Sequence, residues 1–202
     1  MTRIATFVIF FLAIAAAVGC KDDGTGTIEG VFTVSDCGLD NREVNLSADY
    51  FTASYFENTL TIRLQHTTQN YIFADGLLLE IRDVDAAAAA LGEPIVITLV
   101  PSLADFKESG PTETSGNESG FPTTPYNSKA GATLYLNDTC PDSTVSFADG
   151  EGTITFSHIY KPGGAERIAG TFSLEFIDPR TWSSSEDYGA TARISGEFDF
   201  DY

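Results

Sequence analysis

The three cysteines of this chain have the most distinctive chemistry that its sequence offers. Cys20 follows Gly19 at the end of the apolar run 4–18 and directly precedes a charged Lys-Asp-Asp stretch. A cysteine at this position is typical of a lipid attachment point, where the thiol carries an acyl chain. Cys37 and Cys140 then remain as an even pair, which predicts a disulfide in an exported protein. Two buried free thiols are the alternative for this pair.

Residues 1–19 have the parts of an export signal. Met1-Thr2-Arg3 supplies a positive start, and an apolar stretch leads to Ala17-Val18-Gly19-Cys20. This ending resembles a lipoprotein processing box, although Ala17 stands where Leu is usual. We therefore expect residues 1–19 to be cleaved and Cys20 to be acylated. Plain secretion after an Ala-x-Ala site is one alternative, and an uncleaved anchor is another. The apolar run is short for a spanning helix, which needs about 20 residues.

Acylation at Cys20 predicts where the protein resides. Several acyl chains hold a protein on a membrane without a spanning segment. We expect an exported protein that is lipid-anchored to the bacterial cell envelope, at the outer membrane, with a periplasmic or surface-exposed soluble domain. Sorting between membranes depends on residues 21–23, and its rules differ between bacteria.

The charge balance excludes one class of partner. The chain carries 29 acidic and 11 basic residues, a formal net charge of −18. Nucleic acids are bound through clustered Lys and Arg, so we expect no nucleic-acid partner. An acidic coat that keeps an exported domain soluble is the simplest interpretation, and binding of divalent cations is the alternative.

The motifs of common enzymes are absent from the sequence. It has no Gly-x-Ser-x-Gly elbow, no His-Glu-x-x-His and no Cys-x-x-Cys. His66 and His158 fall at the ends of predicted strands, where a surface or capping role is expected. We therefore predict no catalytic residues and no cofactor. A pair of carboxylates for glycoside cleavage is the enzymatic alternative, and its nearest candidates are Glu175, Asp178, Glu197, Asp199 and Asp201.

A loop between two predicted strands is the best candidate for ligand binding. It carries Trp182, the sole tryptophan of the chain, together with Tyr188 and Arg180. Such a group can stack on and hydrogen-bond to a glycan or a peptide. Packing of Trp182 over the core is the structural alternative. Metal ligation has only weak candidates, none in a known loop spacing, namely Asp83, Asp85, Asp149 and Glu151.

Alternation of apolar and polar residues predicts an all-β body. We expect a single β-sandwich or a closed antiparallel β-barrel of about 9–11 strands. The strands are predicted at 28–34, 50–56, 59–65, 77–82, 95–100, 133–137, 144–148, 153–159, 167–177 and 191–202. One short helix is expected near 85–91, capped by Asp83 or Asp85 and ended by Gly92 and Pro94.

The domain boundaries follow from these elements. Residues 20–27 are polar and glycine-rich, which predicts a flexible tether. Residues 28–202 are expected to form one domain. Within it, residues 105–129 have no period and predict a long flexible loop.

A short pattern of the form Ile-x-Gly-x-Phe-x-apolar occurs three times. Its copies begin at Ile28, Ile168 and Ile194, and residues 152–156 are a looser echo. Glycine weakens a strand interior unless a neighbour packs closely against it. We infer that the three copies are adjacent strands of one sheet, with large side chains of neighbouring strands over the glycines. The first strand would then lie beside the last two.

The hairpin predicted from the last two copies, with Gly-Thr-Phe-Ser-Leu and Ser-Gly-Glu-Phe-Asp-Phe, resembles bacterial lipoproteins of unknown function. The resemblance covers about a quarter of the chain, and its motif is structural rather than catalytic. It implies an exported all-β domain and transfers no active site.

These observations favour a lipid-anchored, non-enzymatic envelope or surface protein. We expect it to bind a ligand or partner, either a glycan or a protein, through its β domain. An exported glycosidase-like hydrolase is one alternative. A structural or assembly component of the envelope is the other.

Overall fold

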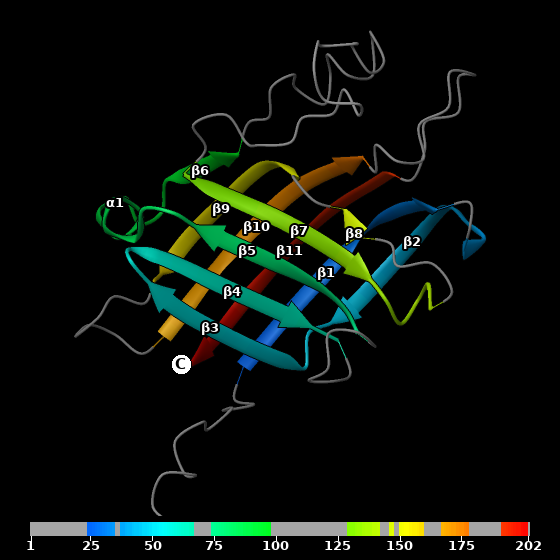
Figure 1. Ribbon diagram of the computed structural model, residues 1–202, viewed down its shortest axis with the longest axis horizontal. Helices are drawn as coiled ribbons and strands as arrows, with labels where there is room; N and C mark the ends of the chain where they lie inside the picture. Colours follow the sequence, from blue (N-terminus) through cyan, green and yellow to red (C-terminus); the bar gives the residue numbers. More distant parts are fainter. Residues whose placement is uncertain are drawn as a thin grey trace, which may run out of the picture.

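Strand pairing in the described part of the chain builds two antiparallel sheets (Figure 1). The computed structural model describes residues 24–34, 37–66, 74–97, 129–141, 146–147, 150–159, 167–177 and 191–201. Eleven strands and one helix lie in these ranges.

The larger sheet has six strands in the order β2-β1-β11-β10-β9-β6. It contains both ends of the described chain, because β1 pairs with β11. Its strands are β1 (Gly24–Val34), β2 (Leu39–Ser47), β6 (Pro94–Ile97), β9 (Glu151–His158), β10 (Arg167–Ile177) and β11 (Thr191–Asp201).

The smaller sheet has five strands in the order β3-β4-β5-β7-β8. The β3–β4 hairpin turns at Glu57 and Asn58, whose φ angles of 46° and 65° are those of a two-residue hairpin turn. The strands are β3 (Tyr50–Phe56), β4 (Thr59–Gln65), β5 (Asp75–Ile81), β7 (Ala130–Leu136) and β8 (Ser146–Phe147).

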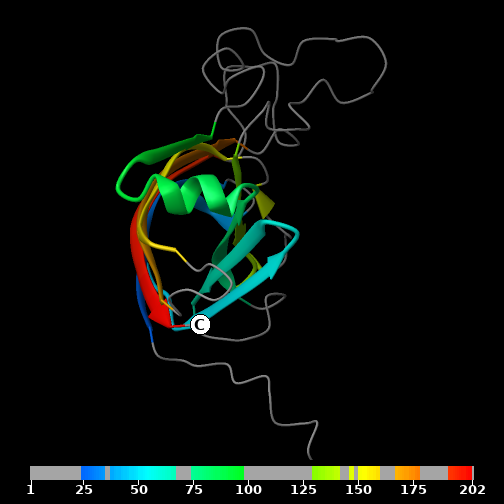
Figure 2. The same cartoon turned by 90° about the vertical axis from the view of Figure 1, so that its left-hand side faces the viewer.

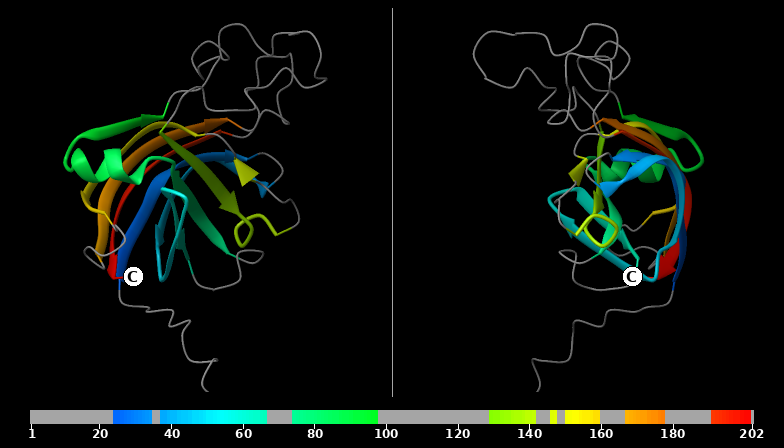
Figure 3. Two further views of the ribbon diagram at one scale, coloured as in Figure 1. Left: turned by 60° about the vertical axis from the view of Figure 1, so that its left-hand side comes forward. Right: turned by 90° about the vertical axis from the view of Figure 1, so that its right-hand side faces the viewer.

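The two sheets pack face to face and enclose one apolar core (Figure 2). Their strands cross steeply, and β2 passes into β3 through only Ala48 and Asp49, so one corner joins the layers (Figures 1 and 3). The predicted all-β sandwich is therefore confirmed. The closed-barrel alternative is wrong, because no strand pair joins the two sheets among the described residues.

The three repeat copies are neighbouring strands, as the pattern predicts. They lie in β1, β11 and β10, and the looser echo lies in β9, the next strand. Across β10 and β11, Gly170 pairs with Phe198 and Phe172 pairs with Gly196. Each phenylalanine thus covers the glycine opposite to it. In β1 the covering side chain at Gly30 is Ile194 rather than an aromatic residue.

The single described helix is α1 (Val84–Ala89), slightly shorter than the span 85–91 that the sequence predicts. Asp83, not Asp85, is the N-cap, and its carboxylate accepts a hydrogen bond from the Ala86 amide at 3.1 Å. The chain then turns at Gly92, which has a φ of 85°, and enters β6 at Pro94. The helix lies at one end of the sandwich (Figure 2).

Cys37 and Cys140 lie at disulfide distance, with their Cα atoms 5.4 Å apart and a sequence separation of 103. The bond ties the β1–β2 connection to the turn after β7. The same turn is held by Asp75, a buried carboxylate that accepts hydrogen bonds from the amides of Asp138 and Thr139 at 2.9 and 3.1 Å. It also accepts one from the Thr139 hydroxyl. The predicted pairing of the two cysteines therefore agrees with the geometry.

Two predictions at the start of the chain need correction. The tether predicted for residues 20–27 is wrong for its second half, because β1 begins at Gly24 and residues 24–27 pair with β11. The strand β2 was not predicted, because its sequence LDNREVNLS is mostly polar and only Leu39 and Leu46 are buried. Residues 1–23 and 105–128, with the predicted signal and most of the predicted loop, lie outside the described residues.

The glycine contacts give a test of the central sheet. A Cβ at residue 196 would lie 1.9 Å from the Thr27 carbonyl oxygen and 2.6 Å from the Phe172 ring. We expect Gly196→Ala to lower the free energy of unfolding by about 1–3 kcal/mol, because backbone and ring must move apart. Urea denaturation measures the loss.

Gly131→Ala in β7 is the matched control. The nearest atom to a Cβ there is the end of the flexible Arg82 side chain, at 3.1 Å. That variant should stay within about 1 kcal/mol of the wild type. Equal stability losses in the two variants would contradict the close approach of β1 to β11.

Candidate functional site

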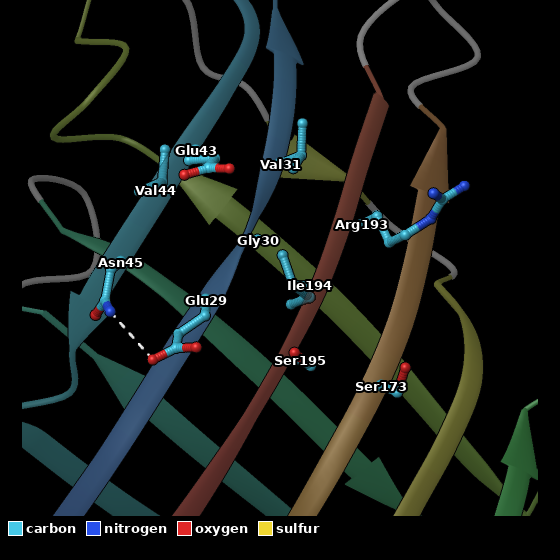
Figure 4. Close-up of a pocket in the computed structure, with 10 residues that line it drawn as sticks. All are labelled: Glu29, Gly30, Val31, Glu43, Val44, Asn45, Ser173, Arg193, Ile194 and Ser195. Atoms are coloured by element: carbon cyan, nitrogen blue, oxygen red, sulfur yellow. Dashed lines mark hydrogen bonds between the residues drawn. The ribbon is translucent and has the colours of Figure 1, made fainter.

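The outer face of the six-stranded sheet, the face turned away from the core, carries a shallow groove of about 620 Å³ (Figure 4). It runs across β2, β1, β11 and β10. Its size is in the range of small-ligand sites, which are commonly 300–1,000 Å³. The lining residues are Glu29, Gly30, Val31, Glu43, Val44, Asn45, Ser173, Arg193, Ile194 and Ser195.

The strand register sets which side chains share the groove. Successive residues of a strand point to opposite faces, so the residues between the core positions of β1 and β11 point outward. Pairing aligns them into two rows across the sheet. One row is Asn45, Glu29, Ser195 and Ser173, and the other is Glu43, Val31, Arg193 and Glu175. The groove is therefore a direct product of the register.

Polar contacts hold part of the groove in place. The Asn45 side-chain amide donates to the Glu29 carboxylate at 3.0 Å. The Arg193 guanidinium lies 3.3 Å from the Glu175 carboxylate, and its side chain is 75% exposed. An exposed ion pair of this kind contributes at most about 1 kcal/mol of stability, so Arg193 can turn toward a ligand at little cost.

The lining groups define what the groove can recognise. It offers carboxylates, an amide, two serine hydroxyls and a guanidinium, which together donate and accept hydrogen bonds. Val31, 40% exposed, is the one exposed large apolar side chain of the lining, which also contains the partly buried Val44 and the buried Ile194. Such a surface suits a polar, uncharged or cationic ligand. The described lining has no aromatic ring for stacking.

A second, smaller hollow of about 310 Å³ lies on the same face, nearer the start of β1. Its lining includes the hydroxyl residues Thr25, Thr155 and Thr171, and the acids Glu197 and Asp199. Hydroxyl-bearing side chains thus continue along the outer face beyond the groove.

One ion pair borders this second hollow. The Arg167 Nε donates to the Asp199 carboxylate at 2.7 Å, and the Arg167 Nη2 donates to its other oxygen. This bidentate hydrogen bond, reinforced by the charge of Arg167, holds the pKa of Asp199 below its ordinary value. Asp199 is therefore ionised at neutral pH.

The predicted ligand-binding residues Trp182, Tyr188 and Arg180 lie outside the described residues, as do Cys20 and Asp149. Nothing in the structure bears on their roles. Among the weak metal candidates, Asp83 caps α1 and also accepts a hydrogen bond from Asn58 at 3.2 Å. Asp85 lies in the first turn of the same helix. Glu151 pairs with Glu175 across β9 and β10.

In the described ranges, no group of three or more His, Cys, Asp or Glu side chains could hold a metal ion. The part of the chain that the structure covers also contains no helix long and apolar enough to cross a membrane. Both histidines lie in the described ranges. His66 contacts the Ser47 carbonyl and the Asp49 carboxylate, at 2.7 and 3.3 Å from its Nδ1, and His158 is an exposed residue at the end of β9.

Comparison of the chain with protein-family models, with curated proteins and with solved structures found no match.

The sequence did not predict the groove, although its signal was present. Glu29, Ser173 and Ser195 are each the residue adjacent to a glycine or phenylalanine of the repeat, on the opposite strand face. Adjacent repeat copies therefore imply that these side chains lie side by side. Asn45 and Glu43 came from β2, which was not predicted.

The Arg167–Asp199 pair gives a pH prediction. We expect the Asp199 carboxyl to titrate below the ordinary aspartate pKa of 3.8. Because the folded-state pKa is lowered, the pair stabilises the fold above the unfolded pKa, and this contribution is lost as pH falls through the folded pKa. An NMR titration of the side-chain carboxyl measures it.

Arg167→Gln should raise the Asp199 pKa toward 3.8, whereas Arg193→Gln, a matched change at another exposed arginine of the same face, should leave it unchanged. An Asp199 pKa that does not respond to Arg167→Gln would show that the pair is not formed in solution.

Proposed function

We propose that this protein is a lipid-anchored, non-enzymatic envelope protein whose β-sandwich binds a polar ligand in the outer-face groove. The observation that carries the binding role is the groove itself, a hollow of about 620 Å³ lined by exposed hydrogen-bonding groups from four strands. Rigid strands hold these groups in fixed positions, which favours selective binding.

The chemistry of the groove supports a neutral glycan as the first ligand class to test. Sugar hydroxyls pair with carboxylates, amides and serine hydroxyls, all of which line this groove. An anionic ligand is disfavoured, because two carboxylates, Glu29 and Glu43, line the groove with one arginine, Arg193, and the whole chain has a net charge of −18.

The membrane anchor is supported by the sequence alone. Residues 1–19 have the organisation of an export signal, and Cys20 follows it directly. A disulfide between Cys37 and Cys140 fits an oxidising compartment outside the cytoplasm.

The hydrolase alternative finds less support on this surface. Glycoside hydrolysis needs a carboxyl group whose pKa is raised by burial, so that it can act as a general acid. The pKa of Asp199 is instead lowered by Arg167. Glu175 forms an ion pair with Arg193, and Glu197 is exposed.

The assembly alternative has one observation in its favour. Edge strands are usually protected by charges, proline or short length. β2 carries Asp40, Arg42 and Glu43, and β6 has four residues beginning with Pro94. β3 has seven residues without a charge and ends in Phe56, which is 72% exposed. Strand addition at β3 would make the protein self-associate, and sedimentation of a Ser54→Lys variant would separate this from ligand binding.

The anchor is tested by Cys20→Ser. We expect the variant to leave the membrane fraction and appear in the soluble exported fraction, because the acyl attachment point is lost. Fractionation followed by immunoblotting measures the shift. Cys37→Ser, which also removes one cysteine but leaves Cys20 in place, should keep the protein in the membrane fraction. Unchanged membrane association of Cys20→Ser would contradict lipid anchoring.

The groove is tested by filling it. We expect Ser195→Tyr to weaken binding of neutral oligosaccharides on a glycan array by about tenfold or more, a loss of about 1.4 kcal/mol. Ser54→Tyr, the same change at an exposed position of β3 on the other sheet, should bind like the wild type. Glycan binding that survives Ser195→Tyr, or no binding by the wild-type protein, would contradict a glycan role for this groove.

A further inference from the structure

The start of β1 marks one end of the sandwich. Gly24 pairs with Phe200 near the end of β11, and Arg167 at the start of β10 pairs with Asp201. The three central strands therefore begin or finish together. Figure 1 shows this end at the bottom of the view, with β1 starting beside the tip of β11.

Few residues separate this end from the proposed lipid attachment point. Gly24 is four residues after Cys20. A fully extended chain spans at most about 3.3–3.6 Å per residue, so this connection reaches roughly 14 Å. Because Gly24 is already hydrogen-bonded into the sheet, the whole sandwich shares this limit.

We infer that the sandwich stands on the membrane with the end formed by the start of β1, the end of β11 and the start of β10 toward the lipid headgroups. This orientation rests on the proposed lipid anchor at Cys20 and adds to it the surface that meets the membrane. The opposite end of the six-stranded sheet points away from the lipid.

Charge pairing at this end suits a lipid surface. Asp199 is paired with Arg167, and Asp49 lies 3.3 Å from His66 at the corner between β2 and β3. The corner lies at the same end, because the Ala48 amide donates to the Gly26 carbonyl at 2.8 Å. The positive charge of Arg167 offsets the negative charge of Asp199, which would otherwise face anionic headgroups. Arg167, one of the 11 basic residues of the chain, lies at this end.

In this orientation the opposite end of the six-stranded sheet points away from the membrane. Ile177 pairs with Thr191 there, and these two residues flank the segment that carries Trp182. Cys37 is in the β1–β2 connection at the same end. The groove is centred near Gly30, six residues along β1, which places it about 20 Å from the membrane-facing end. A ligand can therefore reach the groove from the side while the protein is anchored.

The orientation can be measured with single probes. Cys20 is acylated and Cys37 is bonded to Cys140 in the proposed state, so an introduced cysteine is the only free thiol. Thr25→Cys, Ser195→Cys and Asp40→Cys are exposed positions near the membrane-facing end, at the groove and near the opposite end. Each full-length acylated variant is labelled with a fluorophore and reconstituted into phosphatidylcholine vesicles that contain a headgroup-linked quencher.

Quenching should decrease in the order Thr25, Ser195, Asp40, with about a threefold or larger difference between the ends, because the positions differ by tens of ångströms along the strands. Insertion of about ten Gly and Ser residues between Asp23 and Gly24 should flatten this gradient without releasing the protein, because a flexible linker lets the body tumble.

The outcomes separate the two proposals. A protein that does not float with the vesicles contradicts the lipid anchor, and the orientation with it. A protein that floats but is quenched equally at the three positions, or most strongly at Asp40, overturns the orientation while the anchor stands.

Discussion

The close packing of β1, β11 and β10 is the constraint on which the rest of the structure depends. Gly170 faces Phe198, and Phe172 faces Gly196, so each strand supplies the ring that fills the space above the other's glycine. Such pairs let large rings lie flat on the inner face of a sheet. Phe198 then contacts Phe156 edge-on, with ring centroids 5.8 Å apart. The core of the sandwich is built on these contacts.

The same packing fixes what lies on the outer face. Side chains alternate between the two faces, so once the glycines and phenylalanines are set inward, Glu29, Ser195 and Ser173 must point outward in one row. A shift of one residue would bury these polar groups and expose the rings. The groove and the core are therefore two results of one register.

Much of the fold could be predicted from the sequence, because its signals are local. Clean alternation gave β4 its correct bounds, Thr59–Gln65, and the repeat identified β1, β10 and β11 as neighbours. β2 was not predicted, because an edge strand with exposed charges lacks an alternating pattern. The strand conformation of residues 24–27 was not predicted, because glycine and threonine are typical of linkers. In the structure, pairing with β11 determines their conformation. Predicting the groove required knowledge of the register. Its β2 residues could not be predicted, because that strand was not predicted.

Pairing of β1 with β11 from Gly24 onward sets the register and the groove, and it places the first paired residue only four positions after Cys20. Inter-strand nuclear Overhauser effects, measured by NMR between residues 24–27 and 197–200, test it. We predict cross-strand contacts between Gly26 and Phe198 and between Gly24 and Phe200, with slow amide exchange in this part of the ladder. Absence of these contacts, with rapid exchange from Gly24 to Thr27, would contradict it.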